Sequence, residues 1–172
     1  MSVLETEFPT TSLPIQMLIT VSSIQGGRDH MEDRFHVEIS RDSSDKLDHV
    51  FAAVFDGHGG HEASEYARRN FYNSIMSSAL FKEDQDILNS IRQGFVTTFK
   101  SMREAAKDWP DPNMPGTTAS CAFLRKGKIY IGHVGDSAVI KGSDARTSEQ
   151  LTTDHKPSDP AERIKVIELG GK

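Results

Sequence analysis

The spacing of apolar residues changes twice along this 172-residue chain, and the order of the changes limits the folds that it can adopt. Between residues 34 and 55 apolar residues alternate with polar ones or run together, as they do in β-strands. Between residues 63 and 109 they recur every three or four positions, which is the period of an amphipathic helix. Short apolar runs return between residues 117 and 142. Strands, then helices, then strands predict an α+β fold with helices packed on an antiparallel sheet, rather than a parallel βαβ fold.

The individual elements follow from this spacing and from the turn residues between them. Helices are expected from 63 to 75, from 88 to 109 and, after the helix-starting Pro160, from 161 to 169. Strands are expected at 15–23, 34–40, 49–55, 117–124, 128–134 and 137–142. The strand at 49–55 is apolar almost throughout, which is typical of a strand covered on both faces. Turns at 126–127 and 135–136 predict that the last three strands form an antiparallel meander.

The domain organisation is simple. Residues 1–14 are rich in Ser, Thr and Pro and have no periodicity, so we expect a flexible N-terminal leader. Residues 15–172 then form a single unit, because a chain of this length fits one domain with a real core.

Composition excludes several classes of protein. The net charge of −5 gives no broad positive field, which argues against nucleic acid or an acidic membrane as the main partner. No apolar run approaches the roughly 20 residues that span a bilayer. The N-terminus has no signal-peptide pattern, Ser2 stands where myristoylation requires Gly, and the single Cys121 cannot form an internal disulfide. We therefore expect an intracellular protein of the cytoplasm, the nucleus or both, with no nucleic-acid or membrane partner.

Four acidic residues stand near turn glycines, mostly where a predicted strand begins or ends: Glu32, Asp33, Asp56 and Asp136. Carboxylate oxygens are the ligands that Mg²⁺ and Mn²⁺ prefer, and no cluster of Cys and His competes for zinc. Gly57 has no side chain, so its carbonyl group could approach the same ion as Asp56. This pattern predicts a site for two or more Mg²⁺ or Mn²⁺ ions, which would activate a shared water and neutralise a phosphate group.

Two further residues could act on a phosphate ester at such a site. Arg28 precedes the Glu32-Asp33 pair, and its planar guanidinium group can donate to two phosphate oxygens at once. His58 lies two residues after Asp56 and could protonate the leaving oxygen of serine or threonine, which departs poorly as an alkoxide. Together these residues predict hydrolysis of phosphate monoesters by a metal-activated water.

Each of these residues also has a plain structural explanation. The acidic residues could be solvated or stand in turns, and Arg28 could form a surface ion pair. The other notable histidines are more typical of surface or hydrogen-bonded residues than of ligands; they are His30, His61, His133 and His155. The phosphatase interpretation therefore depends on the ordered set of segments RDHMED, FDGHGG, GTTAS, GHVGDS and TDHKP rather than on any one of them.

Other phosphatase chemistries lack their characteristic residues. A cysteine-dependent phosphatase needs Arg six positions after its Cys, but Gly127 stands six positions after Cys121. Cys121 is therefore interpreted as a buried strand thiol. No Asp-x-Asp pair ends a predicted strand, and the metal-site run Gly-Asp-x-His-Gly does not occur in the chain.

From about residue 19 to 171 the chain resembles the metal-dependent serine/threonine protein phosphatases of type 2C. The resemblance is carried by five segments that occur in the order found in that family: RDHMED, VFDGHGG, GTTAS, HVGDS and LTTDHKP. The segments QGGR, TTAS and DHKP are most similar to the delta, stress-induced branch of the magnesium-dependent group. This resemblance implies an antiparallel β-sandwich flanked by helices. It also implies phosphoprotein substrates and, in a complete form, a monomeric enzyme. Residues 15–172 would be the N-terminal part of the catalytic domain.

The resemblance also implies a role for each candidate residue. Arg28 would be the phosphate clamp and His58 the general acid. Asp56 would bridge two metal ions. The other candidates would complete the metal site: Glu32 and the carbonyl of Gly57 on the second metal, Asp33 through metal waters, and Asp136 on an additional, weaker ion.

The chain departs from this family after the DHKP segment. Family members continue through further strands that carry two more metal-binding aspartates, one in an Asp-Gly pair and one in an Asp-Asn pair, and neither pair follows here. We therefore expect an incomplete sandwich and negligible activity from these 172 residues alone. The alternative function is that of a non-catalytic, truncated family member that binds phosphoproteins or regulates a full-length phosphatase.

Overall fold

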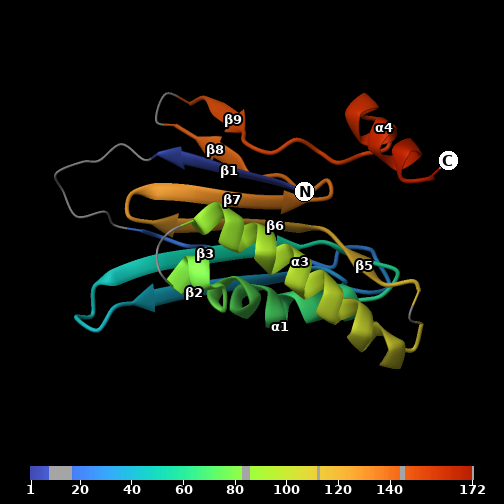
Figure 1. Ribbon diagram of the computed structural model, residues 1–172, viewed down its shortest axis with the longest axis horizontal. Helices are drawn as coiled ribbons and strands as arrows, with labels where there is room; N and C mark the ends of the chain where they lie inside the picture. Colours follow the sequence, from blue (N-terminus) through green and yellow to red (C-terminus); the bar gives the residue numbers. More distant parts are fainter. Residues whose placement is uncertain (8–16, 83–85, 112, 144–145, 172) are drawn as a thin grey trace.

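The centre of the molecule is a five-stranded antiparallel sheet in the order β1-β7-β6-β3-β2 (Figure 1). The computed structural model describes residues 1–7, 17–82, 86–111, 113–143 and 146–171. The strands of the sheet are β1 (Ser2–Glu7), β2 (Arg34–Arg41), β3 (Leu47–Phe55), β6 (Ala119–Arg125) and β7 (Lys128–Val134). The expected strands at 34–40, 49–55 and 128–134 are confirmed, and the one at 117–124 is confirmed from residue 119.

Two long helices lie across one face of this sheet (Figure 1). The helical elements before β6 are α1 (Glu62–Met76), α2 (Ala79–Lys82), α3 (Ile87–Ala105) and the 3₁₀ turn η1 (Ala106–Asp108). The Asp86 side chain caps α3 by accepting a hydrogen bond of 2.9 Å from the Asn89 N–H. The expected α+β fold, with helices on an antiparallel sheet, is confirmed, and α2 is the one short helix in this region that the apolar spacing did not predict.

Aromatic side chains fill the space between the helices and the sheet. The rings of Phe51 and Phe123, on the adjacent strands β3 and β6, are 0% exposed and have centroids 4.9 Å apart. Burial of each such ring contributes roughly 1.5–3 kcal/mol relative to an exposed ring. α3 approaches α1 closely because Gly94 has no side chain that would collide with Ile75.

Cys121 lies in the same core, and burial raises the pKa of its thiol to about 12. The interpretation of Cys121 as a buried strand thiol is therefore confirmed.

The opposite face of the sheet is only partly covered. Val54 on β3 is 51% exposed, so the expectation that β3 is covered on both faces is wrong at this residue. Ile39 on the neighbouring strand β2 is 54% exposed. Residues 17–20 lie beside this face but do not pair with it as a strand. The strand expected at 15–23 is therefore wrong from residue 17 onward, and residues 15 and 16 lie outside the described part of the chain.

The strand expected at 137–142 does not join the central sheet. Instead β8 (Ile140–Gly142) pairs with β9 (Ser148–Gln150) in a separate two-stranded sheet. This contact continues past the strands, because the Leu151 N–H donates to the Val139 carbonyl over 2.8 Å. The predicted meander is therefore wrong in its third strand, since a nearby segment of the chain provides a local partner.

β1 occupies the edge of the sheet beside β7. Val3 lies opposite Gly132 in this pair and packs against the hydrophobic core. Glu5 also reaches Lys128 across the pair, with 2.7 Å between carboxylate and ammonium groups. Residues 2–7 therefore form a strand rather than part of a flexible leader, and residues 8–14 lie outside the described part of the chain. The segment Ser-Val-Leu-Glu-Thr-Glu has only two apolar residues, which are adjacent, so no alternation marks it as a strand in the sequence.

The final helix, α4 (Pro160–Glu168), begins as expected. The Asp159 side chain accepts hydrogen bonds from the N–H groups of Ala161 (2.9 Å) and Glu162 (3.0 Å), and Pro160 occupies the first turn. None of the α4 residues is buried. Among the described residues, no helix is both long enough and apolar enough to span a bilayer.

One carboxylate joins α1 to the turn that precedes β2. Glu65 on α1 accepts hydrogen bonds from three guanidinium groups: Arg34 at 2.9 Å, Arg68 at 2.6 Å and Arg69 at 2.5 Å. Arg34 also donates to the backbone carbonyls of Met31 (3.0 Å) and Asp33 (2.8 Å). Hydrogen bonds from Arg68, and to a smaller extent from Arg69 and Arg34, lower the pKa of Glu65 to about 2. Their combined effect outweighs desolvation, which acts in the opposite direction. The position of the 31–33 turn is therefore tied to α1 through Arg34.

We expect Glu65→Gln to remove a pH-dependent part of the stability. Because the folded-state pKa of Glu65 is about 2 and its ordinary value is 4.5, the ionised form stabilises the fold above pH 4.5. That contribution is lost as the pH falls from about 4.5 towards 2. Urea unfolding of both proteins between pH 7 and pH 2.5 should therefore show a stability difference that is constant above pH 5 and shrinks below it. A difference that does not change with pH would contradict the Glu65 assignment.

Candidate active site

Strand pairing brings the two central acidic residues together. The last pair between β2 and β3 is Arg34 opposite Phe55, and Asp33 and Asp56 lie one step beyond it. Asp56 follows a strand that is hydrogen-bonded on both sides, so its backbone position is well determined. Two of the predicted site residues, far apart in the sequence, are therefore neighbours at one edge of the sheet.

A polar hollow of about 460 Å³ opens at this edge. Of the predicted site residues it is lined by Arg28, Glu32, Asp33, Asp56 and Gly57. The hollow places the cationic group that we expect to bind phosphate beside the acidic groups that we expect to bind metal. His58 and Asp136 do not line it, although both act electrostatically on Asp56.

The carboxylate of Asp56 is held in an unfavourable electrostatic environment. Desolvation raises its pKa above the usual range, and the negative charges of Asp33 and Asp136 raise it further. His58 acts in the opposite direction. Asp33 and Asp136, from distant parts of the sequence, therefore each lie close enough to Asp56 to act on its charge, and a bound cation would relieve that repulsion.

Thr118 connects Asp56 to the turn that carries Asp136. Its hydroxyl accepts a hydrogen bond of 3.2 Å from the Asp56 N–H, and its own N–H donates to the Asp56 carbonyl over 2.9 Å. The same hydroxyl lies 2.7 Å from the hydroxyl of Ser137. Gly135 adopts φ +103° and packs against Thr118, where any side chain would collide. The GTTAS segment thus positions two acidic residues rather than contributing a ligand of its own.

The Glu32 turn is fastened to the loop after β4 (Gly57–His58). The Glu32 carboxylate accepts a hydrogen bond of 2.7 Å from the Gly60 N–H, and the Ser64 hydroxyl donates to the Glu32 backbone carbonyl. Gly57 packs directly against that carbonyl, so a side chain at position 57 would displace the turn. Packing alone therefore requires a glycine at position 57, independently of the predicted role of the Gly57 carbonyl as a metal ligand.

Arg28 sits on an exposed turn that Gln25 closes. The Gln25 side-chain amide donates to the carbonyls of Arg28 (2.7 Å) and Asp29 (3.2 Å), and the Arg28 N–H is 3.4 Å from the Gln25 carbonyl. The Arg28 guanidinium makes no hydrogen bond or ion pair with the described residues, which leaves its donors available. Gln25 is a positioning residue that the sequence analysis missed, although it lies in the QGGR segment.

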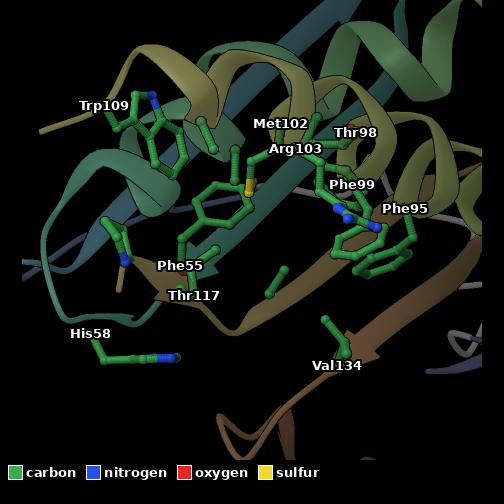
Figure 2. Close-up of a pocket in the computed structure, with 16 residues that line it drawn as sticks. Phe55, His58, Phe95, Thr98, Phe99, Met102, Arg103, Trp109, Thr117 and Val134 are labelled. Atoms are coloured by element: carbon green, nitrogen blue, oxygen red, sulfur yellow. The ribbon is translucent and has the colours of Figure 1, made fainter. Parts of the chain in front are cut away.

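His58 lines a different pocket from the other predicted site residues. Its ring lies against Gly116 of β5 (Gly116–Thr117), which pairs with β4, and a side chain at position 116 would collide with the ring. The ring lines a second, largely apolar pocket beneath α3 (Figure 2). The imidazole is exposed and makes no hydrogen bond with the described residues. His58 thus lines the apolar pocket, while its neighbour Gly57 lines the acidic hollow.

The TDHKP segment supports the Asp136 turn. Lys156 lies 3.5 Å from the Asp136 carboxylate and 2.9 Å from that of Asp154. The Gly135 N–H donates to Nδ1 of His155 over 3.2 Å, and the His155 N–H donates to the Gly135 carbonyl over 2.8 Å. The interpretation of His155 as a hydrogen-bonding residue is therefore confirmed. Lys156 competes electrostatically for Asp136, a role that the sequence analysis did not assign.

The other histidines outside the predicted site agree with their plain interpretations. His133 is buried, 2.9 Å from the Ser120 hydroxyl and 3.1 Å from the Thr153 carbonyl, and burial lowers its pKa. His30 and His61 are exposed.

The donor set fits a divalent cation in its chemistry. Asp33, Asp56 and Asp136 are hard oxygen donors, and desolvation together with the charges of the other two raises the pKa of Asp56. In the described part of the chain, no three Asp, Glu, His or Cys side chains converge closely enough to form a complete ligand group. The assignments of Glu32, Asp33, Asp56, Gly57 and Asp136 to metal, and of Arg28 and His58 to catalysis, therefore stay predictions.

Curated relatives align with most of this chain, and each relative is longer than the aligned part. Probable protein phosphatase 2C 11 of Arabidopsis thaliana is 32% identical over 152 residues, covering 87% of this chain and 38% of the relative. Protein phosphatase 2C homolog 3 of Schizosaccharomyces pombe is 31% identical over 156 residues, covering 90% of this chain and 37% of the relative. The chain thus spans about two fifths of the length of these curated relatives.

The fold is shared with solved structures as well. The crystal structure of serine-threonine phosphatase 2C from Toxoplasma gondii superposes with a TM-score of 0.70 at 25% identity, covering 98% of this chain and 59% of that one. The Protein phosphatase 2C family pattern matches residues 17–172, which include every predicted site residue. The sheet with its two helices, the acidic edge and this match agree, and the chain belongs to the protein phosphatase 2C family.

Proposed function

We propose that this chain carries the metal- and phosphate-binding half of a protein serine/threonine phosphatase. The observation that supports this function best is the hollow in which Arg28 lies beside Asp33 and Asp56. Asp136 also contributes to the raised pKa of Asp56. A phosphate ester needs a cationic clamp, and the acidic groups need a cation to balance them. A dinuclear Mg²⁺ or Mn²⁺ site with phosphoprotein substrates satisfies both requirements.

Each residue would then have a distinct task. Asp56 would bridge the ions, with Glu32, the carbonyl of Gly57, Asp33 and Asp136 completing their surroundings. When bound, the ions would supply the charge that neutralises the phosphate and lowers the pKa of a nucleophilic water. Arg28 would orient the phosphate through two of its donors. Thr118 would keep the backbone of Asp56 in register with the Asp136 turn.

His58 would supply the proton to the leaving alkoxide. Its exposed ring is backed by Gly116 and makes no hydrogen bond with the described residues, so its N–H group can face substrate. Serine and threonine alkoxides are strong bases, and their departure depends on protonation.

The QGGR, TTAS and DHKP segments further support a place in the delta, stress-induced branch, and we propose a monomer for the complete form.

One observation favours the alternative, non-catalytic function. No three potential ligand side chains in the described residues converge as a complete metal site. A chain that clamps phosphoproteins through Arg28 without binding ions would be a binding module rather than an enzyme. Titration of the chain with Mn²⁺ separates the two functions, because only the enzyme needs saturable metal binding.

We expect Asp56→Asn to weaken Mn²⁺ binding by about 10-fold or more, because changes even outside the ligand shell cost roughly 10- to 100-fold. Isothermal titration calorimetry on the 172-residue chain measures this directly, without any need for turnover. Asp108→Asn is the matched control, since Asp108 is exposed in η1 and lies outside the hollow. Equal Mn²⁺ affinities for Asp56→Asn and the unchanged chain would rule out the bridging role.

We expect His58→Gln to slow hydrolysis of a phosphothreonine peptide by about 100-fold or more, within the range that general acids contribute. Hydrolysis of 4-nitrophenyl phosphate should fall much less, because 4-nitrophenolate leaves without a proton. Both rates are measured in the longest form of the protein that turns over substrate. His61→Gln, a substitution on the exposed turn before α1, serves as the control. Equal losses on both substrates would remove His58 from the role of general acid.

A further inference from the structure

The Asp136 carboxylate lies beside a lysine from a different part of the chain. The Lys156 ammonium group is 3.5 Å from Asp136 and 2.9 Å from Asp154, so one cation stands between two carboxylates. Lys156 lies in the segment that joins β9 to α4, whereas Asp136 follows β7 (Figure 1). The two carboxylates therefore share a single ammonium group.

Hydrogen bonds fix the lysine segment against the Asp136 turn. The His155 N–H donates to the Gly135 carbonyl over 2.8 Å, and the Gly135 N–H donates to Nδ1 of His155 over 3.2 Å. Lys156 directly follows His155, and Asp136 directly follows Gly135, so the interacting side chains stand next to the hydrogen-bonded residues. The fold therefore holds Lys156 beside Asp136, unlike a surface lysine whose backbone is free to move.

The two carboxylates differ in how strongly they hold the ammonium group. The hydrogen bond from Lys156 to Asp154 and the charge of Asp154 are the largest causes that raise the pKa of Lys156, and Asp136 adds smaller ones. The hydrogen bond from Lys156 is likewise the largest cause that lowers the pKa of Asp154. Lys156 thus interacts more strongly with Asp154 than with Asp136, in agreement with the two distances.

A metal ion on Asp136 would meet the positive charge of Lys156. Mg²⁺ lies about 2.1 Å from its oxygen ligands, so an ion bound to the same Asp136 oxygen would lie within about 6 Å of the Lys156 nitrogen. Charges this close are only partly screened, since the Debye length is about 8 Å at physiological salt. The ion and the ammonium group would therefore compete for Asp136, and a bound ion would favour the position of Lys156 beside Asp154.

We propose that Lys156 limits the affinity of the metal ion at Asp136, and that Asp154 is a positioning residue that draws the ammonium group aside. This role rests on the proposed function, because it concerns the additional ion that Asp136 would bind. Removal of the Lys156 charge then strengthens metal binding, whereas removal of the Asp154 charge weakens it. The effect of Asp154 passes through Lys156, so it vanishes when the lysine is replaced.

The test is a set of Mn²⁺ titrations on the 172-residue chain, measured by isothermal titration calorimetry and by the electron paramagnetic resonance signal of free Mn²⁺. Low ionic strength is used, because salt weakens interactions between exposed charges. The variants are Lys156→Met, Asp154→Asn and the double variant that combines them. Lys156→Arg keeps the positive charge. Lys165→Met is the matched control, because Lys165 is an exposed lysine of the neighbouring helix α4 and pairs with Glu162 instead.

Lys156→Met should bind Mn²⁺ about 2- to 5-fold more tightly, in line with the loss of one partly exposed ion-pair partner. Lys156→Arg and Lys165→Met should stay close to the unchanged chain. Asp154→Asn should bind Mn²⁺ about 2- to 5-fold more weakly, and the double variant should match Lys156→Met. The gain from Lys156→Met should disappear in an Asp136→Asn background, because the ligand for which the ion and Lys156 compete is then lost.

Three results would overturn the proposal and leave the proposed function intact. The first is equal Mn²⁺ affinity for Lys156→Met and the unchanged chain. The second is a loss of affinity in Asp154→Asn that persists when Lys156 is also replaced, since Asp154 would then act on the ion directly. The third is a gain from Lys156→Met that persists in Asp136→Asn, which would mean a general effect of net charge. Failure of the unchanged chain and of every variant to bind Mn²⁺ would instead contradict the proposed function, and the role of Lys156 with it.

Discussion

The pairing of β3 with β2 on one side and β6 on the other is the constraint on which the candidate site depends. An antiparallel ladder fixes which residues stand opposite one another, and a slip by one residue would turn every side chain to the other face. The buried rings of Phe51 and Phe55 make such a slip costly. Because the register is secure, Asp33 and Asp56 meet at the same edge.

The acidic edge is assembled at an electrostatic cost that the rest of the fold offsets. Desolvation and the negative charges of Asp33 and Asp136 raise the pKa of Asp56. Thr118 is hydrogen-bonded to the Asp56 N–H and to the Ser137 hydroxyl, and Arg34 joins the Asp33 turn to Glu65; these contacts hold the turns in place against that repulsion. Strain of this kind is common where a protein binds a charged ligand, since the ligand supplies the missing opposite charge.

Two environments of opposite character meet at the short β4–β5 pair. The polar hollow lies on one side of Gly57, and the aromatic pocket under α3 begins at His58. The two sites are thus joined through adjacent residues of β4, Gly57 and His58. The His58 ring fits closely against Gly116, so its position depends on β5.

The sequence alone determined the order of strands and helices, the buried stripes of α1 and α3 and the residue types of a phosphate and metal site, because these depend on local spacing and side-chain chemistry. It failed at the edge of the sheet: residues 137–142 were expected to continue the meander and residues 2–7 to be flexible, and only the assembled sheet decides that β1 pairs with β7. The supporting contacts of Gln25, Arg34, Thr118 and Lys156 also emerged only in three dimensions. The contacts of Thr118 and Lys156 join residues far apart in the chain, and no local pattern encodes which distant groups the fold brings within hydrogen-bonding distance.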